Sequence, residues 1–152
     1  MKKFFALICT ITLLMTGCGE NSSANSTEVK EAAPMKNSVT IQVNGKIFSA
    51  TLEDNPTARA FAKKLPLELD MTELNGNEKY FYLDDDLPSD SIRVEQIHAG
   101  DLMLFGSNCL VLFYRDFSTS YTYTRIGRID NPAELEKTLG AGNVRVQFGT
   151  RQ

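Results

Sequence analysis

Two short apolar runs separated by a polar turn constrain the fold of this chain more than any other feature. Residues 102–105 (Leu-Met-Leu-Phe) and 109–113 (Cys-Leu-Val-Leu-Phe) flank the link Gly106-Ser107-Asn108. Short apolar runs joined by turn-forming residues predict a buried β-hairpin. Neither run alternates strictly between apolar and polar residues, which indicates that both faces of the hairpin are covered. We therefore expect this hairpin in the middle of a sandwich or of a closed barrel.

Alternating segments on both sides of this hairpin predict further antiparallel strands. Residues 39–43 and 48–52 alternate around Asn44-Gly45. Because Asn-Gly tolerates the positive φ values of a type I′ turn, these two segments predict a second hairpin. The remaining predicted strands are residues 67–71, 80–83, 121–129 and 144–148, with polar loops at 84–94 and 116–120.

Two short helices are predicted from their capping residues. In the first, Asp54 or Asn55 is the N-cap and Pro56 lies in the first turn, where its missing N–H costs nothing. The second opens within residues 131–134 (Asn-Pro-Ala-Glu) and ends at Gly140. The chain is therefore predicted to be mainly β, a closed antiparallel barrel with two short capping helices. The apolar side chains that the helices would bury are Ala58, Phe61, Ala62, Leu65, Leu135 and Leu139.

Residues 1–17 predict a signal peptide that is removed. A basic start precedes an apolar stretch at residues 4–15, which is too short to span a bilayer. The next residues, 15–18 (Met-Thr-Gly-Cys), resemble the lipobox of bacterial lipoproteins. That resemblance implies cleavage before Cys18 and its acylation, so that lipid chains would anchor the protein to the cell membrane outside the cytoplasm. The alternative is a plain secretory signal whose cleavage site contains a cysteine.

Residues 18–37 predict a flexible tether, because Asn, Ser, Ala, Glu and Lys dominate and few side chains could be buried. The folded domain would then be residues 38–149. If Cys18 is acylated, Cys109 is left without a disulfide partner in the mature chain. Loss of the two signal-peptide lysines would shift the net charge from −3 to about −5, which argues against a nucleic-acid partner.

The predicted order of strands and helices resembles that of the cyclophilin barrel. Residues 100–103 together with 110–113 resemble the central strand pair of that fold, and residues 125–129 resemble the strand before its C-terminal helix. Residues 39–148 are also similar to a compact bacterial branch, the cyclophilin-like proteins of unknown function. The resemblance implies a closed barrel for nearly all of the folded part.

The catalytic residues of cyclophilins have no match at the corresponding positions. Cyclophilins that isomerise X-Pro bonds use an arginine on the strand after the first helix, and residues 67–71 contain none. The chain has no tryptophan for a proline pocket, and Tyr123 stands where the resemblance implies a histidine. Isomerisation must overcome a barrier of about 18–20 kcal/mol, and the arginine hydrogen-bonds the twisted amide. We therefore expect binding without catalysis; the alternative is an extracytoplasmic peptidyl-prolyl isomerase that uses Arg125 instead.

Tyr121, Tyr123 and Arg125 form the leading candidate for a ligand-binding surface. Strand alternation places the three on one face, and the resemblance implies that Tyr123 faces the region where cyclophilins bind proline. The tyrosines could provide flat walls and the arginine a donor fork, so a peptide or small molecule is the expected ligand. The alternative is a cross-strand ladder that only covers the barrel, as in a structural envelope lipoprotein without a pocket.

Phe113 and His98 are weaker candidates near the same hairpin. Phe113 could line the edge of a pocket, although a place in the hairpin core is the simpler interpretation. His98 is the only histidine, and no further metal ligands lie at suitable spacing around it. It could contact a ligand or simply precede the turn at Gly100. We find no pattern that predicts a metal, a cofactor or a nucleophilic catalyst.

Overall fold

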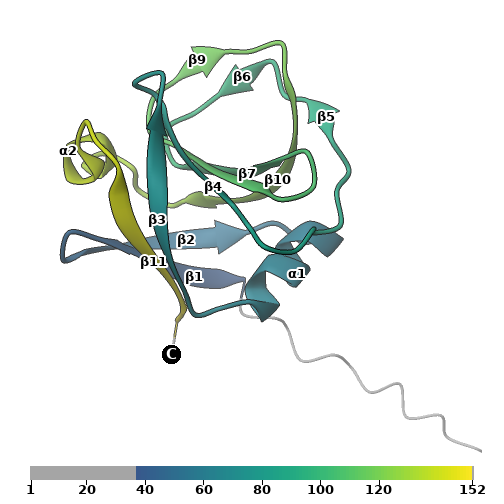
Figure 1. The fold of residues 1–152 in the computed structure, drawn as a ribbon, viewed down its shortest axis with the longest axis horizontal. Coiled ribbons are helices and arrows are strands. Elements are labelled where there is room, and N and C mark those ends of the chain that lie inside the picture. Colours follow the sequence, from purple (N-terminus) through teal and green to yellow (C-terminus); the bar gives the residue numbers. More distant parts are fainter. Residues whose placement is uncertain (1–36, 152) are drawn as a thin grey trace, which may run out of the picture. The chain divides into compact units, whose positions relative to one another are not determined.

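Eight antiparallel strands close into a barrel in the computed structural model, which describes residues 37–151 (Figure 1). The order around the barrel is β2-β1-β11-β3-β4-β8-β7-β10, and β10 pairs with β2 to complete the ring. This confirms the predicted mainly β fold and its closure. The barrel strands are β1 (Ser38–Val43), β2 (Lys46–Leu52), β3 (Leu67–Leu74), β4 (Glu78–Tyr82), β7 (Asp101–Phe105), β8 (Cys109–Phe113), β10 (Thr122–Ile129) and β11 (Val144–Thr150).

The hairpin of β7 and β8 lies in the middle of the sheet, between β4 and β10, and is covered on both faces. Its register pairs Leu102 with Leu112 and Phe105 with Cys109. The inner face contributes to the barrel core, while the outer face belongs to a second apolar cluster. The predicted two-sided burial is therefore confirmed. The inner side chains are Leu102, Leu104, Leu110 and Leu112, and the outer ones are Met103, Cys109, Val111 and Phe113.

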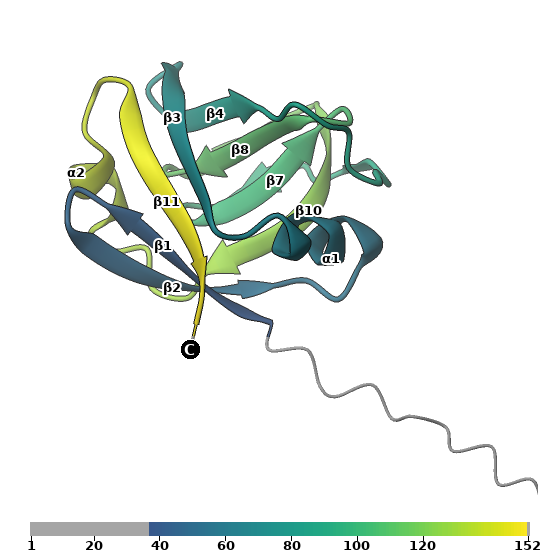
Figure 2. The same cartoon turned by 60° about the horizontal axis from the view of Figure 1, so that its bottom comes forward.

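The two helices lie on opposite sides of the barrel (Figures 1 and 2). The first, α1 (Pro56–Lys63), has Asn55 as its N-cap, whose side chain accepts a hydrogen bond from the Ala58 amide at 2.8 Å. The Asn55 side chain also donates to the Arg125 carbonyl at 2.8 Å, which joins the start of the helix to β10. Phe61 is fully buried and packs edge-on against Phe148 in the barrel core. The capping role that the sequence predicted is thus confirmed, with Asn55 as the N-cap.

The second helix, α2 (Leu135–Leu139), starts later than the sequence predicted. Asn131 and Pro132 belong to the preceding turn, in which the Leu135 amide donates to the Pro132 carbonyl at 2.9 Å. Pro132 therefore does not occupy the first helical turn. The helix buries Leu135 and Leu139 in the core and ends at Gly140, as predicted.

Three two-residue strands occur in segments that the sequence predicted as loops or left unassigned. They are β5 (Ile92–Arg93), β6 (Gln96–Ile97) and β9 (Phe117–Ser118). β5 pairs with the start of β10, and β6 pairs with β9. Ile97 and Phe117 pack onto the outer apolar cluster, so these segments cover the outer face of the central hairpin.

The predicted signal peptide, the lipidated Cys18 and all but the last residue of the tether lie outside the described residues. Within residues 37–151, neither helix has the length and hydropathy needed to cross a bilayer.

Candidate functional site

A pocket of about 500 Å³ opens on the outer face of the barrel, next to the segments that cover the central hairpin. We call it the outer-face pocket. Its floor comes from β8, its two sides come from β4 and from β7 with Tyr123 of β10, and the loop after β8 closes one end. The residues that line it are Leu74, Asn75, Asn77, Glu78, Tyr80, Tyr82, Phe105, Cys109, Val111, Phe117, Ser118, Thr119, Ser120, Tyr121 and Tyr123.

The register of three neighbouring strands places these side chains opposite one another. Tyr80 pairs with Val111, and Tyr82 pairs with Cys109. Cys109 in turn pairs with Phe105 on the other side. Because side chains alternate along β4, Glu78 lies on the same outer face as the two tyrosines. A row of polar and aromatic groups therefore follows one side of an apolar floor.

Aromatic rings line both sides of the pocket and contact one another. Phe105 contacts Tyr121 edge-on, with ring centroids 6.0 Å apart, and lies 5.6 Å from the Tyr123 ring. Tyr80 and Tyr82 are also packed edge-to-face at 5.7 Å. Such arrangements are favoured by the quadrupoles of the rings. The rings thus support one another along the pocket walls.

The rim of the outer-face pocket exposes large apolar side chains to solvent. Within residues 37–151, six large hydrophobic side chains are exposed, and four of them line this pocket. A concentration of exposed apolar surface at a concavity is typical of binding sites. The four residues, with their exposed fractions, are Leu74 (40%), Tyr82 (61%), Phe105 (43%) and Tyr121 (63%).

Glu78 is the only acidic or basic residue that lines the pocket. Burial, together with the nearby charge of Glu73, raises the pKa of its carboxyl group to about 7. Burial and the charge of Glu78 likewise raise the pKa of Cys109 to about 11 and that of Tyr123 to about 12. Glu78 is therefore electrostatically coupled to the floor and to the opposite wall. The Cys109 thiol stays protonated at neutral pH and is a poor nucleophile.

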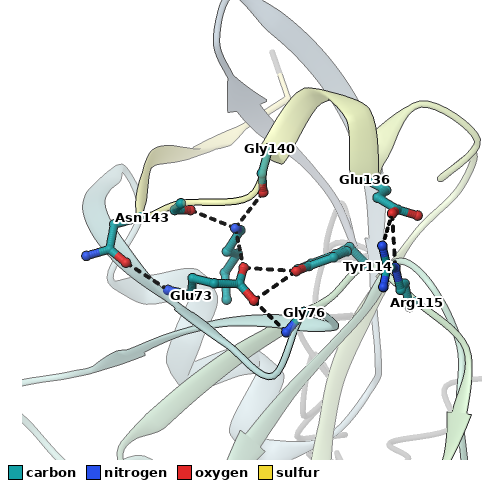
Figure 3. Close-up of polar contacts among 9 residues, drawn as sticks. Glu73, Gly76, Tyr114, Arg115, Glu136, Gly140 and Asn143 are labelled. Atoms are coloured by element: carbon teal, nitrogen blue, oxygen red, sulfur yellow. Dashed lines mark hydrogen bonds and ion pairs between the residues drawn. The ribbon is translucent and has the colours of Figure 1, made fainter.

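A buried polar cluster behind the pocket holds the turn that precedes Glu78 (Figure 3). Lys79, which is fully buried, donates to the Glu73 carboxylate and to the carbonyls of Gly140 (2.8 Å) and Gly142 (2.7 Å). Tyr114 also donates its hydroxyl to Glu73, at 2.9 Å. The strand pair β3–β4 is thereby joined to the segment between α2 and β11.

Glu73 remains ionised within this cluster. Burial opposes its ionisation, but hydrogen bonds from Lys79, Tyr114 and the Gly76 amide outweigh burial and hold the pKa of Glu73 below its usual range. The same environment, burial first and then the hydrogen bond to Glu73, raises the pKa of Tyr114 to about 12. A fixed negative charge therefore lies close to Glu78.

The structure divides the predicted row of Tyr121, Tyr123 and Arg125 between two hollows. Tyr121 lies exposed at the rim of the outer-face pocket, and Tyr123 forms a buried wall. Arg125 lines a separate hollow of about 280 Å³ beside the start of α1, together with Asn55. Arg125 is two residues further along β10, about 7 Å away, and the register with β7 shifts directly after it. Arg125 is thus not among the residues that line the outer-face pocket.

Phe113 and His98 do not line the outer-face pocket either. Phe113 is fully buried in the outer apolar cluster and packs edge-on against Tyr123, at 5.4 Å. It supports the wall from beneath, which agrees with the hairpin-core interpretation. His98 is half-buried in the turn before β7, where its Nδ1 lies 4.0 Å from Asp116 and its amide donates to Asp101. Among residues 37–151, no cluster of three or more His, Cys, Asp or Glu is arranged to hold a metal ion.

A sequence model of the cyclophilin-like family matches residues 41–149 of this chain. The chain belongs to the cyclophilin-like family. Its fold is similar to the solution structure of the hypothetical protein AF2241 from Archaeoglobus fulgidus, with a TM-score of 0.52 and 18% identity. That similarity covers 75% of this chain and 94% of AF2241, and it concerns the fold alone. No curated protein sequence matches the chain significantly.

Sequence reasoning missed the β4 side of the pocket in this cyclophilin-like protein. Glu78, Tyr80 and Tyr82 alternate with Lys79 and Phe81, so the sequence did contain a signal for an outward row. What the sequence did not show is that β4 pairs with β8, about 30 residues away in the chain. Without that pairing the row has no floor and no opposite wall.

Proposed function

We propose that this cyclophilin-like protein is a membrane-tethered binding module that holds a peptide segment or a small molecule in its outer-face pocket. The observation that carries the proposal is a concavity of about 500 Å³ lined by six aromatic side chains. Ligand sites in proteins commonly measure roughly 300–1,000 Å³ and combine apolar walls with a few polar groups. The aromatic residues are Tyr80, Tyr82, Phe105, Phe117, Tyr121 and Tyr123.

The exposed rim favours a ligand that extends beyond the cavity. Leu74 and Tyr82 lie exposed on one side of the opening, and Phe105 and Tyr121 lie exposed on the other. A peptide could place one side chain in the pocket and cover the rim with its neighbours. A free small molecule would fill the cavity but leave this apolar rim exposed to water. The rim would then contribute no binding free energy.

The composition of the pocket supports binding without isomerisation. None of the residues that line it is an arginine, lysine or histidine, whereas twisting a prolyl amide calls for a donor that stabilises the shifted charge. The alternative, an extracytoplasmic peptidyl-prolyl isomerase that depends on Arg125, would require that side chain to reach the outer-face pocket from the neighbouring hollow.

Tethering to the membrane rests on residues 15–18, which resemble a lipobox. We expect Cys18→Ser to release the protein from the membrane fraction and to abolish acylation, read by mass spectrometry. Membrane association that persists in this variant would contradict tethering through Cys18.

Binding can be tested on residues 18–152 with Cys18→Ser, because residues 37–151 close a barrel with its own core. A fragment and peptide collection is titrated against this protein while backbone amide shifts are recorded. We expect ligands to perturb Val111, Tyr121 and Tyr123, and Val111→Trp to abolish these changes by filling the pocket. The control is Ile47→Trp, an exposed position outside the pocket. Ligands that bind Val111→Trp as well as the unsubstituted protein would contradict the proposal.

A proline-peptide isomerisation assay on the same protein separates the two functions. We expect no acceleration above the uncatalysed rate. Acceleration that disappears in Arg125→Ala would establish the isomerase alternative instead.

A further inference from the structure

The outer-face pocket is lined by groups that attract cations and by no group that repels them. Its lining includes the Glu78 carboxyl and the rings of four tyrosines, but none of the basic side chains within residues 37–151. Aromatic faces carry negative electrostatic potential and attract ammonium groups within about 6 Å of the ring centre. The tyrosines are Tyr80, Tyr82, Tyr121 and Tyr123.

We infer that the outer-face pocket recognises a positively charged alkylammonium group, held between the Glu78 carboxylate and the tyrosine rings. The inference rests on the proposed binding function and specifies the charge of the ligand. A lysine side chain of a peptide and a free small amine share this chemistry.

Aromatic rings line two sides of the pocket, and Glu78 lies at one end of the row on β4. Glu78, Tyr80 and Tyr82 follow one another on the outer face of β4, and the planes of the two rings stand 77° apart. On the other side, Phe105 and Tyr121 meet at 86°. A cation inside the pocket would therefore lie among aromatic rings and close to a carboxylate.

One buried hydrogen-bond acceptor beside Glu78 lacks a donor. Asn77 lines the pocket beside Glu78, and its buried Oδ1 has no hydrogen-bond partner among residues 37–151. A buried acceptor without a donor is costly, and such groups are usually satisfied. An ammonium group carries several N–H donors. Binding of an ammonium group beside Glu78 would bring N–H donors close to this acceptor.

The basic side chains of the adjoining turn are already engaged and do not neutralise Glu78. Lys79 uses all three of its donors on Glu73, Gly140 and Gly142. Arg115, which approaches the turn at Gly76, donates to Glu136 instead. Glu73 on β3 lies close to Glu78 and is acidic. The other titratable groups that line the pocket are Cys109 and four tyrosines, and none of them is cationic.

The proposed recognition implies that binding depends on pH. The Glu78 carboxyl has a pKa of about 7 without a ligand, and an adjacent ammonium charge would lower that pKa. Cations should therefore bind more tightly at pH 8, where Glu78 is ionised, than at pH 5, where it is protonated.

The test uses pairs of ligands that differ in charge. Residues 18–152 with Cys18→Ser are titrated at pH 8 with n-butylammonium and with n-butanol, and with a short peptide that contains lysine or norleucine at one position. We expect each cation to bind on the order of tenfold more tightly than its neutral partner and to shift the amides of Glu78 and Tyr123. Tight binding of the lysine peptide alone would identify a peptide source, whereas comparable binding of n-butylammonium would identify small amines.

Two variants connect the preference for cations to Glu78. Glu78→Gln should sharply reduce the preference to what the tyrosine rings alone supply, while Glu68→Gln removes the same charge from an exposed position outside the pocket and should leave the preference intact. Equal binding of charged and neutral partners would overturn the inference and leave the proposed binding function standing. Failure of all four ligands to bind would also overturn it, and the wider ligand collection would then decide the binding function. A preference of unchanged size in Glu78→Gln would likewise contradict it.

Discussion

Glu78 and Lys79 are neighbours in β4, yet they belong to different environments on its two faces. Glu78 lines the outer-face pocket, whereas Lys79 is fully buried and bonded to Glu73. Strand alternation separates the two side chains, so the lysine does not neutralise the acid next to it. Burial raises the pKa of the Glu78 carboxyl, and the nearby negative charge of Glu73 in the Lys79 pair raises it further. The Lys79–Glu73 ion pair and the outer-face pocket therefore share strand β4, one on each of its faces.

The buried cluster around Lys79 should be important for stability. We expect Lys79→Met to lower the free energy of unfolding by roughly 2–3 kcal/mol, because it leaves the Glu73 carboxylate, which is only 19% exposed, without its cation. Urea denaturation measures this change. Arg145→Met, which removes an exposed pair with Asp70, is the control and should cost less than about 1 kcal/mol. Equal effects of the two substitutions would show that the cluster contributes little.

Glu78 should make stability decrease as pH rises through neutrality. Its pKa is raised from 4.5 to about 7 in the folded state, so the native protein binds a proton more tightly than the unfolded chain between these values. The free energy of unfolding of Glu78→Gln should equal that of the unsubstituted protein at pH 4 and exceed it at pH 8. The difference at pH 8 should be roughly 1–2 kcal/mol, because water in the open pocket screens the Glu78 charge. Thermal unfolding across this pH range measures the difference. A stability difference between the two proteins that decreases with rising pH would contradict the predicted direction.

The Cys109 thiol should react slowly although it lines the pocket. Its pKa of about 11 exceeds the ordinary 9.0, so the thiolate fraction at pH 8 is lower by a factor of about 100. In residues 18–152 with Cys18→Ser it is the only cysteine, and alkylation by iodoacetamide followed by mass spectrometry reports on it alone. We expect labelling in the native state to be slower by at least this factor than in urea. Equal rates would show that the pocket does not suppress ionisation.

The N-cap of α1 gives a further test of how the helix is joined to the barrel. Asn55→Ala removes hydrogen bonds to the Ala58 amide and to the Arg125 carbonyl, and should cost roughly 1–2 kcal/mol in unfolding free energy. Asp54→Ala, at the other residue that the sequence left open as the cap, removes only an exposed pair with Arg59 and should cost under about 1 kcal/mol. A larger loss for Asp54→Ala, measured by urea denaturation, would contradict this assignment.

Local patterns predicted those elements whose signals lie within a few residues. Asn44 and Gly45 both adopt positive φ, 47° and 79°, as an Asn-Gly turn requires, and the covered hairpin at residues 101–113 follows from two adjacent apolar runs. The start of α2 was misplaced because Asn131-Pro132 suits a turn as well as an N-cap. Strands of two residues, such as β6 and β9, are too short to give any periodicity.

The outer-face pocket was predicted only in part because it depends on long-range pairing. Tyr121 and Tyr123 were found from alternation within one strand, and both line the pocket. Arg125 shares that alternation but lines another hollow. Glu78 became significant only when the β4–β8 register placed it opposite Phe113, in one outward row with Tyr80 and Tyr82, which pair with Val111 and Cys109. Such cross-strand neighbours come from distant parts of the chain, so no local pattern reveals them.

The most direct test of the account is a map of amide shift changes on residues 18–152 with Cys18→Ser, recorded as the lysine peptide is added at pH 8. The account predicts that the changes cluster on residues 78–82, 105–111 and 117–123 and disappear in Val111→Trp. Changes that cluster instead around Arg125 and the start of α1, or that persist in Val111→Trp, would contradict it.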